Sequence, residues 1–180
     1  MAKNFIETRY SMVQVALKYA SICGIFLTII FHVSFLFDSN PLIDVSHLIF
    51  DLLILGLFIF FGQKEFKSYH AGQYFHFWQG MTIGFLIYTV ATFIFSALFL
   101  IYFEVSTEAL VNYKAEALEF LSSKKEFYTE EFGSEGFQQQ MDSINQITAS
   151  DLAISATVKK LLAGFFITPV ISIILRKQPK

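Results

Sequence analysis

Residues 71–103 read AGQYFHFWQGMTIGFLIYTVATFIFSALFLIYF and contain no Asp, Glu, Lys or Arg. The hydrocarbon core of a bilayer is about 30 Å thick, which a helix of roughly 20 residues crosses. Because lipid offers no hydrogen-bond partner to the backbone, such a stretch crosses a membrane as a helix. The sequence therefore predicts a transmembrane helix over residues 74–103.

The composition of the whole chain is that of a membrane protein. Of its 180 residues, 54% are hydrophobic and 18% aromatic, and 23 are Phe. A soluble domain of this size has no interior large enough to bury so much apolar surface. Three further apolar stretches, 13–37, 41–61 and 152–175, are long enough to span. We predict an all-α integral membrane protein with four transmembrane helices, forming a single membrane domain over 1–180.

The second of these spans has clear boundary signals in the sequence. Asn40 suits a helix N-cap, and Pro41 suits the first helical position. Gly62 is the first residue that favours termination after the apolar run. These residues predict a helix over 41–61.

A polar insertion over residues 104–150 separates the last two spans. Its apolar residues recur at helical spacing on several faces, and two glycines interrupt the pattern. We therefore expect two or three amphipathic helices. Their apolar positions either fold on each other, rest on the membrane interface as a cap, or dock a partner. The partner-binding candidates are Val111, Leu118, Phe137, Met141 and Ile144, with Ala115 on the stripe of Val111 and Leu118, and Leu110, Ala117 and Leu121 on another face.

The charges predict the sidedness of the chain, because Lys and Arg concentrate on the cytoplasmic side of membrane proteins. The insertion with its flanking residues, 104–151, has ten acidic residues and three lysines, which gives −7. The two terminal segments and the second loop carry eight basic and two acidic residues, which gives +6: Lys3, Arg9, Lys18, Lys64, Lys67, Arg176, Lys177 and Lys180 against Glu7 and Glu65. Both termini are expected in the cytoplasm, with the insertion outside it.

The stretch 62–103 combines a short basic loop, an aromatic-rich start and a long glycine-containing third span. A polar insertion, a last span and the basic tail over 176–180 follow it. This arrangement resembles the domain-of-unknown-function 4199 family of short bacterial membrane proteins, found mainly in Bacteroidota. The resemblance covers nearly the whole chain. It implies a four-span protein of the bacterial inner membrane, of unassigned function and without catalytic residues to transfer.

Asp51 is the most informative single residue, because it falls near the middle of the predicted second span. An intramembrane carboxylate costs about 2.5–3.5 kcal/mol on insertion scales and usually faces the inside of a bundle. It is either a proton or cation relay or, as we favour, a buried group bonded to a neighbouring helix. Lys159 and Lys160 open the apolar part of the last span. At least one is expected to snorkel to the interface, and the alternative is that one pairs with Asp51.

Two histidines, His32 and His47, lie at similar predicted depth on the first two spans. Such a pair is able to ligate haem or a metal. A single pair is a weak pattern, and imidazoles more often form ordinary hydrogen bonds. We therefore expect no cofactor and no metal. Asp44 lies with His47 and Asp51 on one face of the predicted helix.

The Gly80-x-x-x-Gly84 pattern on the third span permits close approach of another helix. It predicts packing against a sister span or, as the alternative, against a second copy of the chain.

No nucleotide-binding loop, nucleophile elbow, zinc signature or pair of catalytic carboxylates is present in the sequence. The basic residues lie at membrane boundaries, which suits lipid rather than nucleic acid. We therefore expect a non-enzymatic protein without an identified small-molecule substrate, an accessory or scaffold subunit that contacts lipid and other membrane subunits or itself. The alternatives are a small oligomeric transporter or channel that uses Asp51, and a redox subunit that uses His32 and His47.

Overall fold

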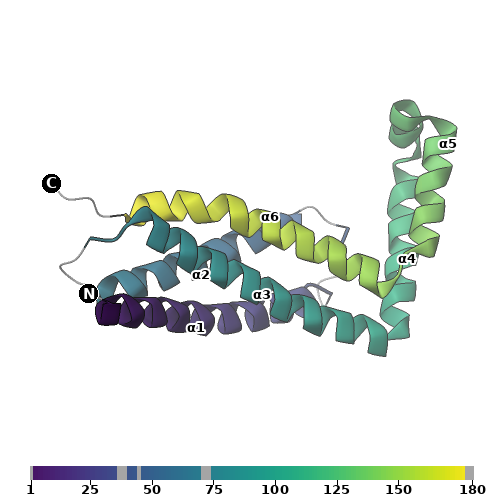
Figure 1. Ribbon diagram of the computed structural model, residues 1–180. Coiled ribbons are helices and arrows are strands. Elements are labelled where there is room, and N and C mark those ends of the chain that lie inside the picture. Colours follow the sequence, from purple (N-terminus) through teal and green to yellow (C-terminus); the bar gives the residue numbers. More distant parts are fainter. Residues whose placement is uncertain (1, 36–39, 44–45, 70–73, 177–180) are drawn as a thin grey trace.

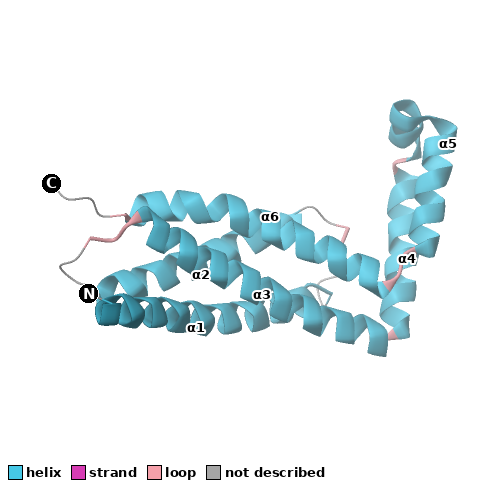
Figure 2. Ribbon diagram, in the orientation of Figure 1, coloured by secondary structure: helices cyan, strands magenta, loops and turns pink. Residues whose placement is uncertain are grey.

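The computed structural model describes residues 2–35, 40–43, 46–69 and 74–176, and within them every regular element is a helix (Figures 1 and 2). The elements in chain order are α1 (Ala2–Phe35), α2 (Ser46–Tyr69), α3 (Phe77–Val105), α4 (Thr107–Ser123), α5 (Lys125–Gln146) and α6 (Ala149–Leu175).

Four of these helices, α1, α2, α3 and α6, lie side by side in a bundle (Figure 1). Each contains a segment that is long and apolar enough to cross a membrane: Met12–Ser34, His47–Tyr69, Phe77–Val105 and Ala149–Leu175. This confirms the predicted all-α fold with four candidate spans. We call the end where α1 begins and α6 ends the terminal end, and the end where α4 and α5 attach the hairpin end.

The core of the bundle forms around α3, which contacts α1, α2 and α6. Toward the hairpin end, Phe31 of α1 packs between rings of α3, with its ring centroid 5.0 Å from that of Phe99 and 5.8 Å from that of Phe95. Large apolar side chains also cover the outward faces of all four helices. An apolar exterior over an apolar core is the arrangement that a hydrocarbon solvent requires.

Helix α2 begins and ends later than the range 41–61 predicted from the sequence. The Asn40 side chain accepts a hydrogen bond from the Leu42 N–H, and its carbonyl accepts one from Ile43. Asn40 therefore caps a turn rather than a helix. At the other end, a Cβ on Gly62 would lie 2.5 Å from Ile87 Cδ1. This glycine permits close packing on α3, and the helix continues to Tyr69.

The insertion forms a helical hairpin of α4 and α5 that stands across the bundle axis (Figure 1). A non-helical Gly133, with φ 74° and ψ 170°, kinks α5 near the tip. At the base, Ala109, Leu110 and Tyr113 pack against the bundle core. Burial there raises the pKa of the Tyr113 phenol. Two helices with a glycine kink agree with the two or three that the periodicity predicts.

The apolar stripes of the hairpin differ in burial. Val111 is 64% exposed and Ala115 is also exposed, whereas Ala117 and Leu121 are buried. Of the alternatives that the sequence leaves open, packing within the hairpin therefore holds for the face with Ala117 and Leu121, whereas Val111 and Ala115 remain exposed for contact outside the chain. The remaining candidates, Leu118, Phe137, Met141 and Ile144, are half-buried. Among the described elements, the main contacts of α5 are with α4, so the two helices cover each other.

Gly80 and Gly84 both contact sister helices, as the sequence predicts for a glycine pair of this spacing. A Cβ on Gly80 would lie 2.8 Å from Ser172 Oγ of α6. A Cβ on Gly84 would overlap the Thr168 methyl group and lie 3.2 Å from Ile59 of α2. The pair therefore brings α3 against α6 and α2 within one chain.

We predict that Gly84→Val lowers the free energy of unfolding by about 1–3 kcal/mol, because the added side chain cannot fit beside Thr168 without moving α6. Ala97→Val, at an exposed position of the same helix, is the matched control and should change stability little. The measurement is equilibrium unfolding in mixed micelles. Equal stability of the two variants, with a changed oligomeric state for Gly84→Val alone, would indicate a dimer face instead.

Candidate functional site

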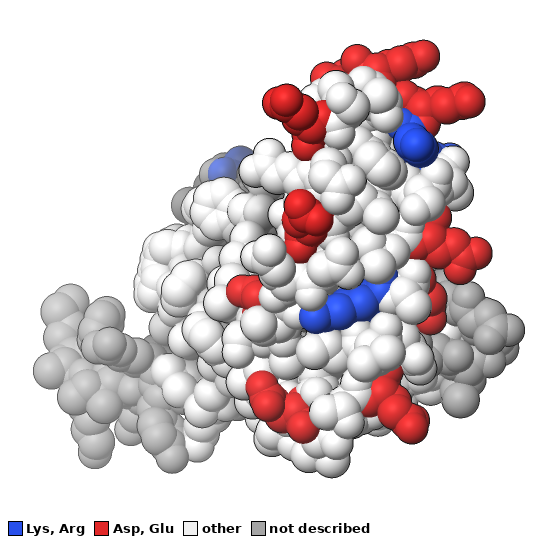
Figure 3. Space-filling model, turned by 90° about the vertical axis from the view of Figure 1, so that its right-hand side faces the viewer, with Lys and Arg blue, Asp and Glu red and all other residues white. Residues whose placement is uncertain are grey.

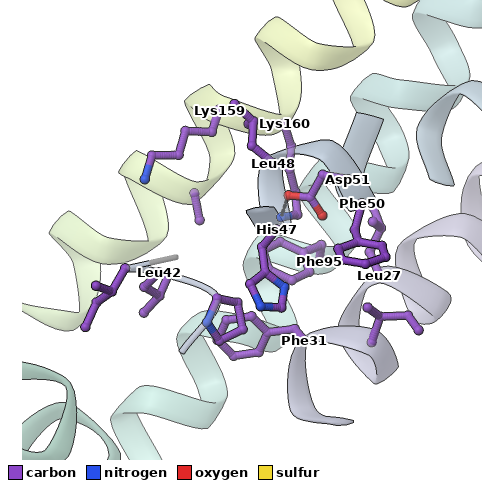
Figure 4. A pocket seen from close by; sticks show the side chains of 14 residues that line it. Leu27, Phe31, Leu42, His47, Leu48, Phe50, Asp51, Phe95, Lys159 and Lys160 are labelled. Atoms are coloured by element: carbon purple, nitrogen blue, oxygen red, sulfur yellow. Dashed lines mark hydrogen bonds and ion pairs between the residues drawn. The ribbon is translucent and has the colours of Figure 1, made fainter. Parts of the chain in front are cut away.

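Asp51 lies on α2 close to the hairpin end of the bundle. Because α2 begins at Ser46, Asp51 is its sixth residue, about 8 Å along the helix axis from the start. The sequence places it near the middle of the span, and the shifted helix start accounts for the difference. The carboxylate points into the bundle, toward α6 (Figure 4).

Lys160 of α6 supplies the partner of this carboxylate. Its Nζ lies 2.5 Å from Asp51 Oδ2, and the side chains are 8% and 19% exposed, respectively. The same Nζ lies 4.1 Å from the centroid of the Phe95 ring on α3. Lys160 is thus held between a carboxylate and an aromatic face, both of which stabilise a buried ammonium group. The ion pair connects α2 with α6, and the contact with the Phe95 ring adds α3.

The sequence leaves open whether Lys159 or Lys160 turns inward. Successive residues on a helix point about 100° apart, so only one of two neighbours can face α2. The structure turns Lys160 inward and leaves Lys159 exposed, directed away from Asp51 (Figure 4). Lys159 therefore occupies the position expected of a snorkelling lysine.

A cavity of about 170 Å³ lies beside the ion pair. It has room for a few water molecules. Its polar lining consists of Asp51, His47 and the two lysines, and the rest is mostly apolar (Figure 4). The apolar lining comes from α1, the turn before α2, α2 and α3: Leu27, Ile30, Phe31, Pro41, Leu42, Ile43, Leu48, Phe50 and Phe95, with Ala156 of α6.

The two histidines do not line this cavity together. His47 lines it, with its ring centroid 6.0 Å from that of Phe50. His32 is outside the lining; its Nδ1 donates to the Thr28 carbonyl over 2.8 Å, and its ring packs edge-on against Tyr102. Within the described ranges, no group of three or more His, Cys, Asp and Glu side chains is placed to hold a metal ion. Asp44 lies outside the described residues.

A second polar cluster, which sequence reasoning missed, lies toward the terminal end. Glu65 of α2 accepts hydrogen bonds from Lys18 Nζ at 2.9 Å, Tyr19 Oη at 2.7 Å and Tyr69 Oη at 3.0 Å. These bonds connect α2 with α1. Ending the predicted helix at Gly62 put Glu65 in a loop. The signal that was available is the run QKEFK after Gly62, which consists mainly of good helix formers.

Gln63 and Lys67 extend this cluster to the other two helices. The fully buried Gln63 donates from Nε2 to the Gly80 carbonyl at 3.1 Å and to Ser172 Oγ at 3.0 Å. Lys67 Nζ donates to the Leu175 carbonyl at 2.9 Å, at the end of α6. The two residues are four apart on α2 and so share one helix face. All four bundle helices are therefore joined by polar contacts near the terminal end.

Apolar side chains separate the two polar regions. Along α2, Leu55 and Ile59 follow Asp51 at intervals of one turn, and both are fully buried. Asp51 and Glu65 are 14 residues apart, which corresponds to roughly 21 Å of helix. Leu55 and Ile59 cannot relay a proton or coordinate a cation, so α2 itself offers no polar path over this stretch.

These features define a class of protein, the multi-pass helical membrane protein with a four-helix bundle and a helical insertion. The family model described as "protein of unknown function (DUF4199)" matches residues 18–177, which include most of the first span, the other three spans and the hairpin. The chain belongs to this family, as the sequence resemblance predicts. A comparison with curated proteins finds no match, and a comparison with solved structures finds none either.

We predict that Lys160→Met destabilises the bundle by about 2–3 kcal/mol, because it leaves the Asp51 carboxylate without its partner. The loss is smaller than for a fully enclosed pair because Asp51 retains some contact with solvent. Adding Asp51→Leu should recover most of the stability. Lys159→Met is the matched control and should be close to neutral. The measurement is a double-mutant cycle by equilibrium unfolding, and additive effects of the two substitutions would contradict a coupled pair.

Proposed function

We propose that this protein is a non-enzymatic accessory or scaffold subunit of a membrane complex, which presents the α4–α5 hairpin to a basic partner. On this proposal it resides in the bacterial inner membrane, with both termini in the cytoplasm and the hairpin outside. The observation that carries the proposal is the hairpin itself, since α4 and α5 extend beyond the bundle that they are attached to (Figure 1).

The surface of the hairpin that faces away from the bundle supports a binding role. Figure 3 views the molecule from this side and shows acidic side chains spread over the hairpin, with few basic ones among them. Val111 lies exposed on α4 with Glu108 and Glu119. A charged surface around an apolar residue favours a partner of opposite charge and steers its approach.

The charge distribution supports the orientation. Lys64, Lys67 and Arg176 lie at the terminal end of the bundle, whereas residues 104–151 at the other end carry −7. Positive charge marks the cytoplasmic side in multi-pass proteins. The even number of candidate spans is consistent with both termini on that side.

A second candidate function, an oligomeric transporter or channel, has one observation in its favour, the cavity beside Asp51. Two observations favour the scaffold over it. Lys160 already pairs with the Asp51 carboxylate that a cation would have to use, and along α2 the buried Leu55 and Ile59 separate Asp51 from Glu65. A conduction path would thus have to run between copies of the chain.

The test is site-directed crosslinking from the exposed apolar position of the hairpin. In a Cys23→Ala chain, Val111→Cys is labelled with a membrane-impermeant photoreactive thiol reagent, applied to the outer side of spheroplasts. We expect labelling, followed on illumination by a discrete protein adduct. Glu108→Lys together with Glu119→Lys should reduce the adduct several-fold, because they reverse the charge that attracts the partner.

The control is Ile154→Cys, on the exposed apolar face of α6, which should react poorly because lipid covers it. The two parts of the proposal fail separately. Absence of labelling at Val111→Cys in intact spheroplasts, with labelling after lysis, contradicts the orientation. Labelling without any protein adduct contradicts the scaffold role.

A further inference from the structure

The geometry of the hairpin relative to the bundle determines how it meets the bilayer. Four spans that cross a membrane must run roughly along the membrane normal. The hairpin stands across the bundle axis, so α4 and α5 run parallel to the membrane plane (Figure 1). Ser106 alone separates α3 from α4, and Ile147 and Thr148 separate α5 from α6. These connections are too short for the hairpin to rise away from the surface.

The apolar exterior of α3 continues up to the hairpin. Val105, the last residue of α3, is 81% exposed, and Ile101 one turn earlier is also exposed. Exposed side chains of this kind at the end of a span are expected in contact with the acyl chains or the headgroup boundary. The base of the hairpin therefore lies at the depth of the lipid headgroups.

One face of α4 is directed toward the bundle and, beyond the bundle, toward the bilayer. Ala109 and Tyr113 of this face pack on the bundle core. Further along, the Glu116 carboxylate accepts a hydrogen bond of 2.8 Å from Asn40, in the connection between α1 and α2. Phe120 is seven residues after Tyr113 and so lies on the same face, but it is 45% exposed. Phe120 lies in the last turn of α4, and the outer part of the hairpin extends past the edge of the bundle (Figure 1).

We propose that the hairpin lies flat on a phospholipid bilayer and that Phe120 inserts at the boundary between headgroups and acyl chains. The tip of the hairpin near Phe120 carries further aromatic and basic side chains that suit a lipid interface. Phe127 and Phe132 are exposed apolar rings, and Lys124 and Lys125 are exposed cations that could reach lipid phosphates. Shallow insertion of aromatic residues with flanking lysines is a common mode of interfacial binding.

The acidic charge of the hairpin determines the headgroup charge of the lipids on which it can lie. Residues 107–146, which contain α4 and α5, carry eight acidic residues and three lysines, which gives −5, so an anionic bilayer would repel them, whereas a zwitterionic headgroup does not. The face with Val111 points away from the membrane, because Val111 lies nine residues before Phe120 and thus about 180° around α4 from it. Lipid contact on one face leaves the opposite face free, so this inference does not depend on the scaffold proposal or on the sidedness of the chain.

The experiment places a tryptophan on each face of α4 in the full-length protein. Trp78→Phe removes the single native tryptophan. Phe120→Trp and Val111→Trp are then compared in nanodiscs of phosphatidylcholine brominated near the headgroup end of the acyl chains, with one protein per disc. We expect bromolipid to quench Phe120→Trp several-fold more than Val111→Trp, and acrylamide to show the reverse order.

Equal acrylamide quenching at the two positions would overturn the proposal. So would shielding of Phe120→Trp that appears only in discs with two copies, because a second chain would then cover this face. A nitroxide attached at Phe120→Cys or Val111→Cys in the Cys23→Ala chain repeats the comparison without an indole. Molecular oxygen should relax the label at position 120 more strongly, and a water-soluble nickel chelate the one at position 111.

Discussion

The structure depends on one constraint, that a hydrocarbon solvent hydrogen-bonds to neither backbone nor side chains. The backbone meets it by forming four long helices, and the charged side chains Asp51 and Glu65 meet it by pairing with side chains of neighbouring helices. Asp51 pairs with Lys160 toward the hairpin end, and Glu65 gathers Lys18 and two tyrosines toward the terminal end. Because each pairing joins different helices at a fixed level, the two together set the register of the bundle.

The same constraint shapes the interior and the insertion. Without a hydrophobic driving force between helices, close contact is the main source of packing energy in lipid. Glycines provide it where α3 meets α6 and α2, at Gly80 and Gly84. The hairpin is the part of the chain to which the constraint does not apply. The proposed placement, with water on one face and the membrane interface on the other, accounts for its acidic composition and its exposed residues.

Much of the fold follows from the sequence, because span number and helix type depend on hydropathy and length alone. The boundaries of α2 do not, because Pro41 and Gly62 are used for a turn and for close packing rather than for starting and ending a helix. Because of this shift, Asp51 lies nearer the start of α2 than the sequence predicts, and Glu65 lies within the helix rather than in the predicted loop. From the sequence, pairing of an inward lysine with Asp51 was one of two alternatives. Which lysine turns inward could not be predicted, because that depends on the rotation of α6 about its own axis. The contact between Ser96 and Thr157, 2.5 Å across α3 and α6, carries no signal in one sequence, since both residues also bond to their own helix.

The central claim is that an upright bundle carries a hairpin lying in the membrane plane. Solid-state NMR of protein in oriented bilayers tests it directly, because the amide nitrogen shift reports the tilt of each helix. Seven of the ten glutamates lie on α4 and α5, whereas most isoleucines lie in the four spans. We predict that nitrogen-15 isoleucine gives mainly resonances of helices along the membrane normal and that nitrogen-15 glutamate gives mainly in-plane resonances, with the glutamates of the bundle helices as the minority. Most of the glutamate intensity at the position for helices along the normal would contradict the account.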